Sequence, residues 1–115
     1  MKKAVTLKKN HEFRRLYQKG VSAAGAGLVI YCRKNRLGHN RLGITASTKL
    51  GCAVVRNRAR RRLREVYRLH QDQMLQGYDV VLVARRRAVD MPWGDLNQSF
   101  FRLAGKLKLL RGEEA

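Results

Sequence analysis

Acidic residues are scarce in this sequence. Its 115 residues include 8 Asp and Glu against 26 Lys and Arg, which gives a formal net charge of +18 at pH 7 and a pI near 11.3. Such an excess of one sign destabilises the compact state through self-repulsion, so we expect a polyanionic partner to relieve it. Nucleic acid is the commonest partner of this kind, and an anionic membrane surface is the alternative.

Long apolar runs and a cysteine framework are lacking as well. No run reaches the roughly 18 residues that a membrane-spanning helix requires, and the first residues lack the apolar core of a signal peptide. Cys32 and Cys52 can form at most one disulfide, and both occupy positions where buried free cysteines are common. These features favour a reduced cytoplasmic protein with no membrane partner. The length and the 44% apolar content favour a single domain over residues 1–115.

The side chains that metal or hydrolytic chemistry would need do not cluster along the sequence. The three histidines show no metal-ligand spacing with the cysteines, and Gly25-Ala26-Gly27 lacks the remaining parts of a phosphate-binding loop. Apart from Glu113-Glu114, the carboxylates stand singly, at Glu12, Glu65, Asp72, Asp79, Asp90 and Asp95. We therefore expect no catalytic residue and no metal site on the protein itself.

What the sequence does contain is a dense group of arginines. Seven Arg and one Glu fall within residues 56–68, so acidic partners at i,i+4 spacing cannot neutralise most of the charge. On a helix, the apolar stripe that would face a core comprises Cys52, Val55, Ala59, Leu63, Val66, His70 and Met74. The opposite ridge comprises Asn57, Arg61, Arg64 and Arg68, flanked by Arg58, Arg60 and Arg62. Most charge runs are solvated helix faces, but unpaired planar guanidinium groups favour phosphate binding here.

The remaining pattern predicts the order helix, two strands, helix, strand, helix. A brief edge strand is expected around Val5 and Leu7, and a first helix from Asn10, as its N-cap, to Lys19. Strands are expected over residues 21–33, 41–47 and 78–84, and the arginine-rich helix is expected to end near residue 76. After Pro92, apolar residues at helical spacing predict a last helix. This order indicates one α+β domain with helices packed on a small sheet.

A family resemblance rests on the segment Val55-Arg56-Asn57-Arg58. The chain resembles the protein component of bacterial ribonuclease P, whose hallmark is an Arg-Asn-Arg helix after a strand and a short glycine-containing loop. The resemblance covers nearly the whole chain and includes residues 7–20, 28–31, 41–47, 56–65 and 78–85. There are two departures. Thr48-Lys49 stands where the family often has two lysines, and Cys52 stands where it often has a polar residue.

The resemblance implies an α/β sandwich, in which a small mixed sheet packs with three helices, as in a domain of a ribosomal protein. It also implies a left-handed βαβ crossover into the arginine-rich helix, which composition could not indicate because such crossovers are nearly always right-handed.

The resemblance further implies the protein subunit of an endoribonuclease whose RNA subunit removes the 5′ leader from precursor tRNA. Mg²⁺ would be held mainly by the RNA, the protein alone would be inactive, and no obligate protein partner is expected. The implied contacts with the RNA subunit are Arg56, Asn57, Arg58, Arg60, Arg61 and Arg64, to which we add Arg68 and Lys49. The implied contacts with the leader, in a cleft between the first helix and the sheet, are Phe13, Tyr17 and Tyr31.

Some alternatives remain open. The pattern alone favours a core role for the three aromatic residues, whereas unpaired bases would stack on such rings beside cations, and both roles are compatible. A ribosomal or general RNA-binding protein would share the charge without a role in tRNA processing. A DNA-binding module would read bases in the major groove, but no helix-turn-helix spacing is present. The intermittent, small-residue stripe of the arginine-rich segment would make a poor lipid anchor.

Overall fold

The apolar run Tyr78–Ala84 forms β5, the middle strand of a five-stranded mixed sheet. The computed structural model describes residues 5–111. The sheet order is β1-β4-β5-β3-β2, in which β1–β4 and β4–β5 are parallel and β5–β3 and β3–β2 are antiparallel. The other strands are β1 (Val5–Thr6), β2 (Val21–Ala24), β3 (Leu28–Lys34) and β4 (Arg41–Thr45). The expected edge strand is thus confirmed as β1.

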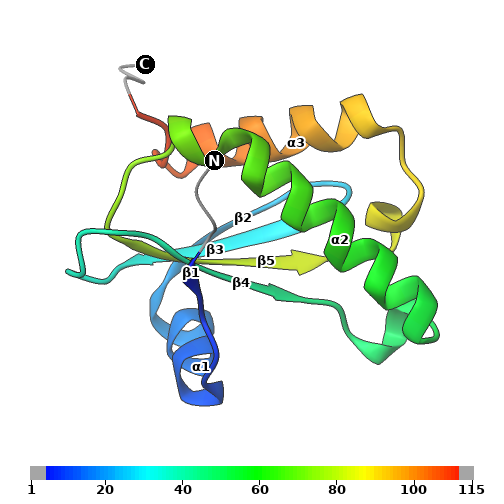
Figure 1. Cartoon of the computed structure of the whole chain (residues 1–115), viewed down its shortest axis with the longest axis horizontal. Helices are drawn as coiled ribbons and strands as arrows, with labels where there is room; N and C mark the ends of the chain where they lie inside the picture. The colour runs from blue at the N-terminus through cyan, green and yellow to red at the C-terminus, as the bar shows by residue number, and fades with distance from the viewer. Residues whose placement is uncertain (1–4, 112–115) are drawn as a thin grey trace.

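Helices cover both faces of this sheet (Figure 1). On one face lie α2 (Ala53–His70) and α3 (Trp93–Lys106), and on the other lies the shorter α1 (Asn10–Lys19). The larger core lies under α2 and α3, where Leu63, Val66 and Phe100 have no exposed surface. A much smaller cluster of Leu7, Leu16 and Val81 lies under α1. No helix in the described part of the chain is long and apolar enough to cross a membrane.

The connection from β4 through α2 to β5 joins two parallel neighbours. In Figure 1 the chain runs to the right along β4, rises into α2, returns to the left along it, and descends to β5 behind β4. A path that turns counter-clockwise as it recedes from the viewer is left-handed. The expected left-handed crossover is therefore confirmed, although about 98% of such connections are right-handed.

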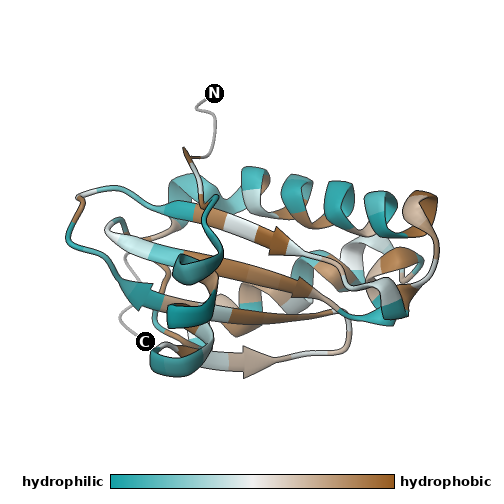
Figure 2. Ribbon diagram, turned by 90° about the horizontal axis from the view of Figure 1, so that it is seen from below, coloured by the Kyte–Doolittle hydropathy of each residue, from teal (hydrophilic) through white to brown (hydrophobic). Residues whose placement is uncertain are grey.

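The helix α1 crosses the sheet instead of following its strands (Figure 2). It starts beside β4, where the amide of Leu7 donates a hydrogen bond to the carbonyl of Leu42 at 2.8 Å. It ends beside β3, where Gly20 lies so close to the carbonyl of Cys32 that a Cβ would stand only 2.7 Å from its oxygen. This crossing divides one face of the sheet into two halves.

The predicted strand over residues 21–33 is wrong, because the chain reverses there and forms the antiparallel hairpin β2–β3. The hairpin turn fits closely against the loop and helix that follow β5. A Cβ on Gly25 would lie 2.6 Å from Ser99 Oγ, and one on Gly27 would lie 2.5 Å from Met91 Sδ. The small residues that we expected to bend a strand thus allow a turn to pack closely against α3 and the loop before it.

Three further expectations are corrected. Asn10 is the first helical residue and Lys9 is the N-cap of α1. The helix α2 ends at His70, because the chain tightens into a 3₁₀ turn at Gln71–Gln73 and Met74 then pairs with Leu110 in an isolated bridge. Met74 is buried, as the apolar stripe requires, but it is not helical. Cys52 is exposed, whereas Cys32 is buried and both are free.

Candidate nucleic-acid interface

The outward side of α2 carries the ridge that the sequence predicts. Asn57, Arg61 and Arg64 are exposed, while Leu63 and Val66 on the opposite side are fully buried. Within residues 5–111, the side chains of Arg61 and Arg64 make no hydrogen bond or ion pair. Two guanidinium groups one turn apart therefore face solvent without an acidic partner in the described part of the chain, an arrangement that suits phosphate oxygens.

Arg68 differs from the rest of this ridge. Its Nε donates to a carboxylate oxygen of Glu65 at 2.9 Å, and a second nitrogen donates to the other oxygen. The hydrogen bond from Arg68 lowers the pKa of the Glu65 carboxyl group. The one acidic residue within this arginine-rich segment thus pairs with the last of its arginines and leaves the earlier ones unneutralised.

Two of the flanking arginines, Arg58 and Arg62, join α2 to the 3₁₀ turn Arg86–Val89 and the residues just after it. Arg58 Nε donates to the carbonyl of Val89 at 2.7 Å. Arg62 donates to the carbonyls of Ala88 and Met91 at 2.8 and 2.6 Å, and its guanidinium lies 5.7 Å from the centre of the Trp93 ring. Arg62 is therefore a structural residue.

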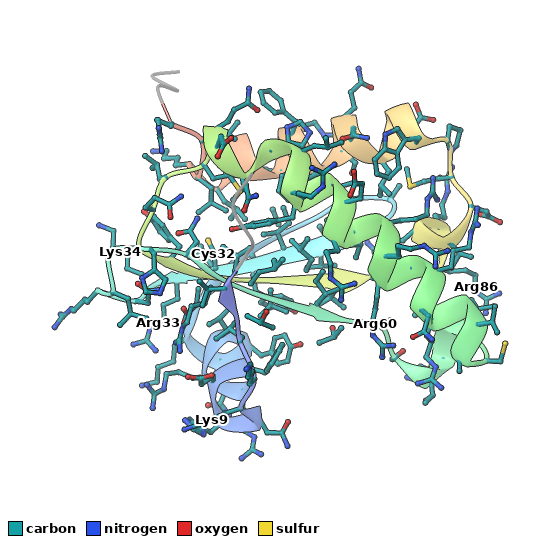
Figure 3. The ribbon with its side chains drawn as sticks, in the orientation of Figure 1. Lys9, Cys32, Arg33, Lys34, Arg60 and Arg86 are labelled. Carbon is teal, nitrogen blue, oxygen red and sulfur yellow. The ribbon has the colours of Figure 1, made fainter. Side chains whose placement is uncertain are left out.

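The remaining predicted RNA contacts differ in their exposure and in their hydrogen bonds. Arg60 is half-buried, donates to Asn57 Oδ1 at 2.9 Å, and points from α2 towards the end of β4 (Figure 3). Arg56 is half-buried, and its buried Nε has no hydrogen-bond partner among the described residues. Lys49 is exposed on the 3₁₀ turn Thr48–Leu50, just before α2.

A groove lies along one side of α1. It encloses about 530 Å³ and is lined by Asn10, Phe13, Arg14, Tyr17 and Thr45. The ring of Tyr17 packs edge-on against that of Tyr31 on β3, with centroids 4.9 Å apart. Tyr17 is 41% exposed, whereas Phe13 and Tyr31 are half-buried and also pack on the small core under α1. Phe13 thus combines a core contact with a place in the groove lining, Tyr17 exposes its ring there, and Tyr31 packs against Tyr17 without lining the groove itself.

The floor of this groove depends on Gly43 of β4. A Cβ at this position would lie 2.6 Å from the Phe13 ring, so only glycine lets the ring rest on the sheet. The sequence reasoning missed Gly43, and it also missed Arg14, which lines the groove beside the aromatic rings. Arg14 could have been predicted as a groove residue, because it follows Phe13 directly on the same helix.

On the other side of α1, Arg41 joins two carboxylates that are far apart in the sequence. Its Nε and one terminal nitrogen donate to Asp79 at 2.9 and 2.8 Å, and the other terminal nitrogen donates to Glu12 at 2.8 Å. Asn35 Nδ2 also donates to Asp79 at 2.8 Å. Burial alone would raise the pKa of both carboxyl groups, but the bonds from Arg41 lower each pKa below its ordinary value.

This network was not foreseen, because single acids on separate elements give no pairing signal. Within residues 5–111, no group of three or more His, Cys, Asp or Glu side chains comes together as metal ligands would. The network ties α1 to β4 and β5, and so it fixes the helix that forms the wall of the groove.

Comparison with known proteins places this geometry in a family. The family model for ribonuclease P matches residues 1–108. The ribonuclease P protein component of Natranaerobius thermophilus is 45% identical over 111 residues, which cover 96% of each chain. The chain belongs to the ribonuclease P protein family.

Solved ribonuclease P proteins have the same fold. The protein from Staphylococcus aureus aligns with a TM-score of 0.83 and 37% identity, covering 95% of this chain and 100% of that one. The protein from Thermotoga maritima aligns with a TM-score of 0.76 and 25% identity, covering 84% and 92%.

In this ribonuclease P protein, the two predicted sets of contacts lie on opposite faces of the sheet. The arginine ridge is on α2, and the aromatic groove lies beside α1. The groove and the ridge approach each other at one end of the sheet. Thr45, which lines the groove, is the last residue of β4, and the chain continues from there through the turn that carries Lys49 to the start of α2. Arg85, Arg86 and Arg87 are exposed after β5, and Arg86 lies at the same end as the start of α2 (Figure 3).

Proposed function

We propose that this protein is the RNA-binding subunit of ribonuclease P and promotes removal of the 5′ leader from precursor tRNA. The ridge on α2 binds the RNA subunit, and the groove beside α1 receives the unpaired leader. The observation that carries the proposal is the pair Arg61 and Arg64, whose exposed side chains have no bonded partner within residues 5–111 and lie on the side of α2 opposite its buried residues. An excess of +18 charges then lowers the electrostatic cost of bringing two RNAs together.

The groove supports the second half of the proposal. Tyr17 presents an exposed ring face next to Arg14, and stacking of an unpaired base on such a ring contributes about 1–3 kcal/mol. Base stacking tolerates any sequence, which suits a subunit that must accept leaders of many sequences. Lys49 and Arg56 lie where the groove end meets α2, and we assign them to RNA contacts at that junction.

The hydrolysis itself belongs in this proposal to the RNA subunit, with Mg²⁺ held mainly by RNA. The two carboxylates that lie together near α1, Glu12 and Asp79, are both bonded to Arg41. The protein improves metal use indirectly, because it positions the substrate that the metal ions act on.

The test is reconstitution at low magnesium from purified protein, the RNA subunit and precursor tRNA. The protein alone is inert in this account, and adding it to the RNA lowers the magnesium requirement and tightens binding of precursor tRNA relative to mature tRNA. Cleavage by the protein without RNA would overturn the division of labour. Equal binding of precursor and mature tRNA would favour a general RNA-binding protein.

A further inference from the structure

A second hollow lies on the side of α1 away from the groove. It encloses about 490 Å³ where β4 and β5 begin and β3 ends. Its rim carries Arg15 of α1, Arg33 and Lys34 of β3, and Arg36 of the following turn, and the Arg41 network lies within it. We call these four rim residues and the space they surround the basic hollow. Figure 3 shows Arg33 and Lys34 together at this end of the sheet.

The charge of the basic hollow is not balanced by its own acids. Its two carboxylates, Glu12 and Asp79, are both bonded to Arg41. Arg15, Lys34 and Arg36 are exposed and make no hydrogen bond or ion pair with any side chain in residues 5–111. The network therefore neutralises the groups that would repel an anion and leaves the rim cations available.

The basic hollow and the groove are connected across α1. Arg14 lines the groove and Arg15, the next residue, lines the hollow, and both side chains are exposed. A helix with its side chains is only about 10–12 Å wide. A strand that leaves the groove can therefore cross over α1 between these cations and reach the hollow on the same face of the sheet. The arginine ridge, by contrast, lies on the other face.

We propose that the basic hollow binds phosphates of the 5′-distal part of the precursor tRNA leader, after that strand has left the groove. The proposal rests on the proposed function. Among the described residues that line the hollow, His11 carries the one aromatic ring and cationic side chains predominate, so its main contacts are with phosphates. A short leader ends within the groove, and only a longer leader reaches the second site.

The test compares two triple variants with equal loss of charge in the assembled holoenzyme. One carries Arg15→Gln, Lys34→Gln and Arg36→Gln. The control carries Arg102→Gln, Lys106→Gln and Arg111→Gln, three exposed cations on and after α3. The affinity for precursor tRNA is measured, under conditions that prevent cleavage, with a leader that ends in the groove and with one that extends beyond it.

With the hollow variant, we expect long-leader affinity to fall about 10-fold or more relative to the control, and the slope of log affinity against log salt to flatten by about two units. Short-leader affinity stays unchanged and reports that the variant is folded. An equal loss for both leaders, weaker assembly with the RNA subunit, or behaviour identical to the control would each overturn the proposal. If the wild-type holoenzyme itself shows no preference for precursor over mature tRNA, the proposed function fails instead.

Discussion

At the scale of single residues, Arg41 joins three elements outside the main core, α1, β4 and β5. Three of its nitrogens donate to carboxylates of α1 and β5, and its side chain is 23% exposed. Its bonds with Asp79 raise the pKa of the guanidinium further above its ordinary value, so Arg41 stays charged. Two of the few acidic residues, Glu12 and Asp79, thus hold α1 against the sheet through their bonds with Arg41.

Replacing Asp79 by Asn should lower the free energy of unfolding by about 2 kcal/mol near neutral pH, because Arg41 loses its charged, two-oxygen partner. Asp72→Asn, on an exposed turn, is the matched control and should have little effect. Urea unfolding of both variants measures the difference, and equal stabilities would contradict the assigned role of the network.

The same network predicts a dependence of stability on pH. The pKa of Asp79 and of Glu12 is lower in the folded protein than the ordinary values of 3.8 and 4.5. Each carboxylate therefore stabilises the fold above its ordinary pKa, and this contribution disappears as the pH falls through the folded pKa. Unfolding measured from about pH 6 down to about pH 3 should show a steeper loss of stability for the wild type than for Asp79→Asn.

At the scale of elements, α1 is the least embedded helix. Only Leu16 among its ten residues is buried, and the cluster beneath it is small. Its position depends on the Arg41 network on one side and on the Phe13 ring over Gly43 on the other. The groove wall is thus held by few contacts, and its side chains are free to serve binding.

Tyr17→Ala tests this element directly. Because Tyr17 offers the most accessible aromatic ring of the groove, its loss should weaken binding of precursor tRNA by about 1–3 kcal/mol, with no change for mature tRNA. The control is Phe101→Ala on α3, which removes a ring of similar exposure, 44% against 41%. An equal effect of both variants on precursor binding would place the leader elsewhere.

Elements with strong periodicity could be predicted from the sequence. The helical spacing of Leu63 and Val66 predicted the buried side of α2, and the apolar run of β5, interrupted only by Asp79, identified the central strand. Boundaries set by tertiary contacts could not be predicted. The turn at Gly25-Ala26-Gly27 forms against Ser99 and Met91, and α2 ends early because Met74 pairs with Leu110. The Arg41 network could not be predicted for the same reason, because Glu12 and Asp79 come close to Arg41 only once α1 has packed across the sheet.

At the scale of the whole molecule, charge and fold are coupled. A net charge of +18 on one small fold creates repulsion that only anions relieve, and the ridge, the groove end and the basic hollow distribute these cations over both faces of the sheet. We therefore expect bound RNA to stabilise the fold of the protein.

Multivalent anions should accordingly raise the melting temperature. An anion at 100 times its dissociation constant adds about 2.7 kcal/mol of stability. Thermal unfolding in sulfate at low concentration, where its exclusion from the protein surface contributes little, is compared with sodium chloride at the same ionic strength to separate anion binding from screening. The same melting temperature in both salts would contradict anion-linked stability.

The most direct test of the central claim is the affinity of the purified protein for the RNA subunit, measured for Arg61→Glu/Arg64→Glu beside the control Arg102→Glu/Lys106→Glu. The side chains of Arg61 and Arg64 are exposed and make no hydrogen bond or ion pair with the described residues. Arg102 and Lys106 are exposed as well, so both double variants should fold like the wild type. The account predicts that the α2 variant binds about 100-fold more weakly, since two charge-assisted contacts are lost, while the control stays within a few-fold of the wild type. Equal affinities of the two variants for the RNA subunit would contradict it.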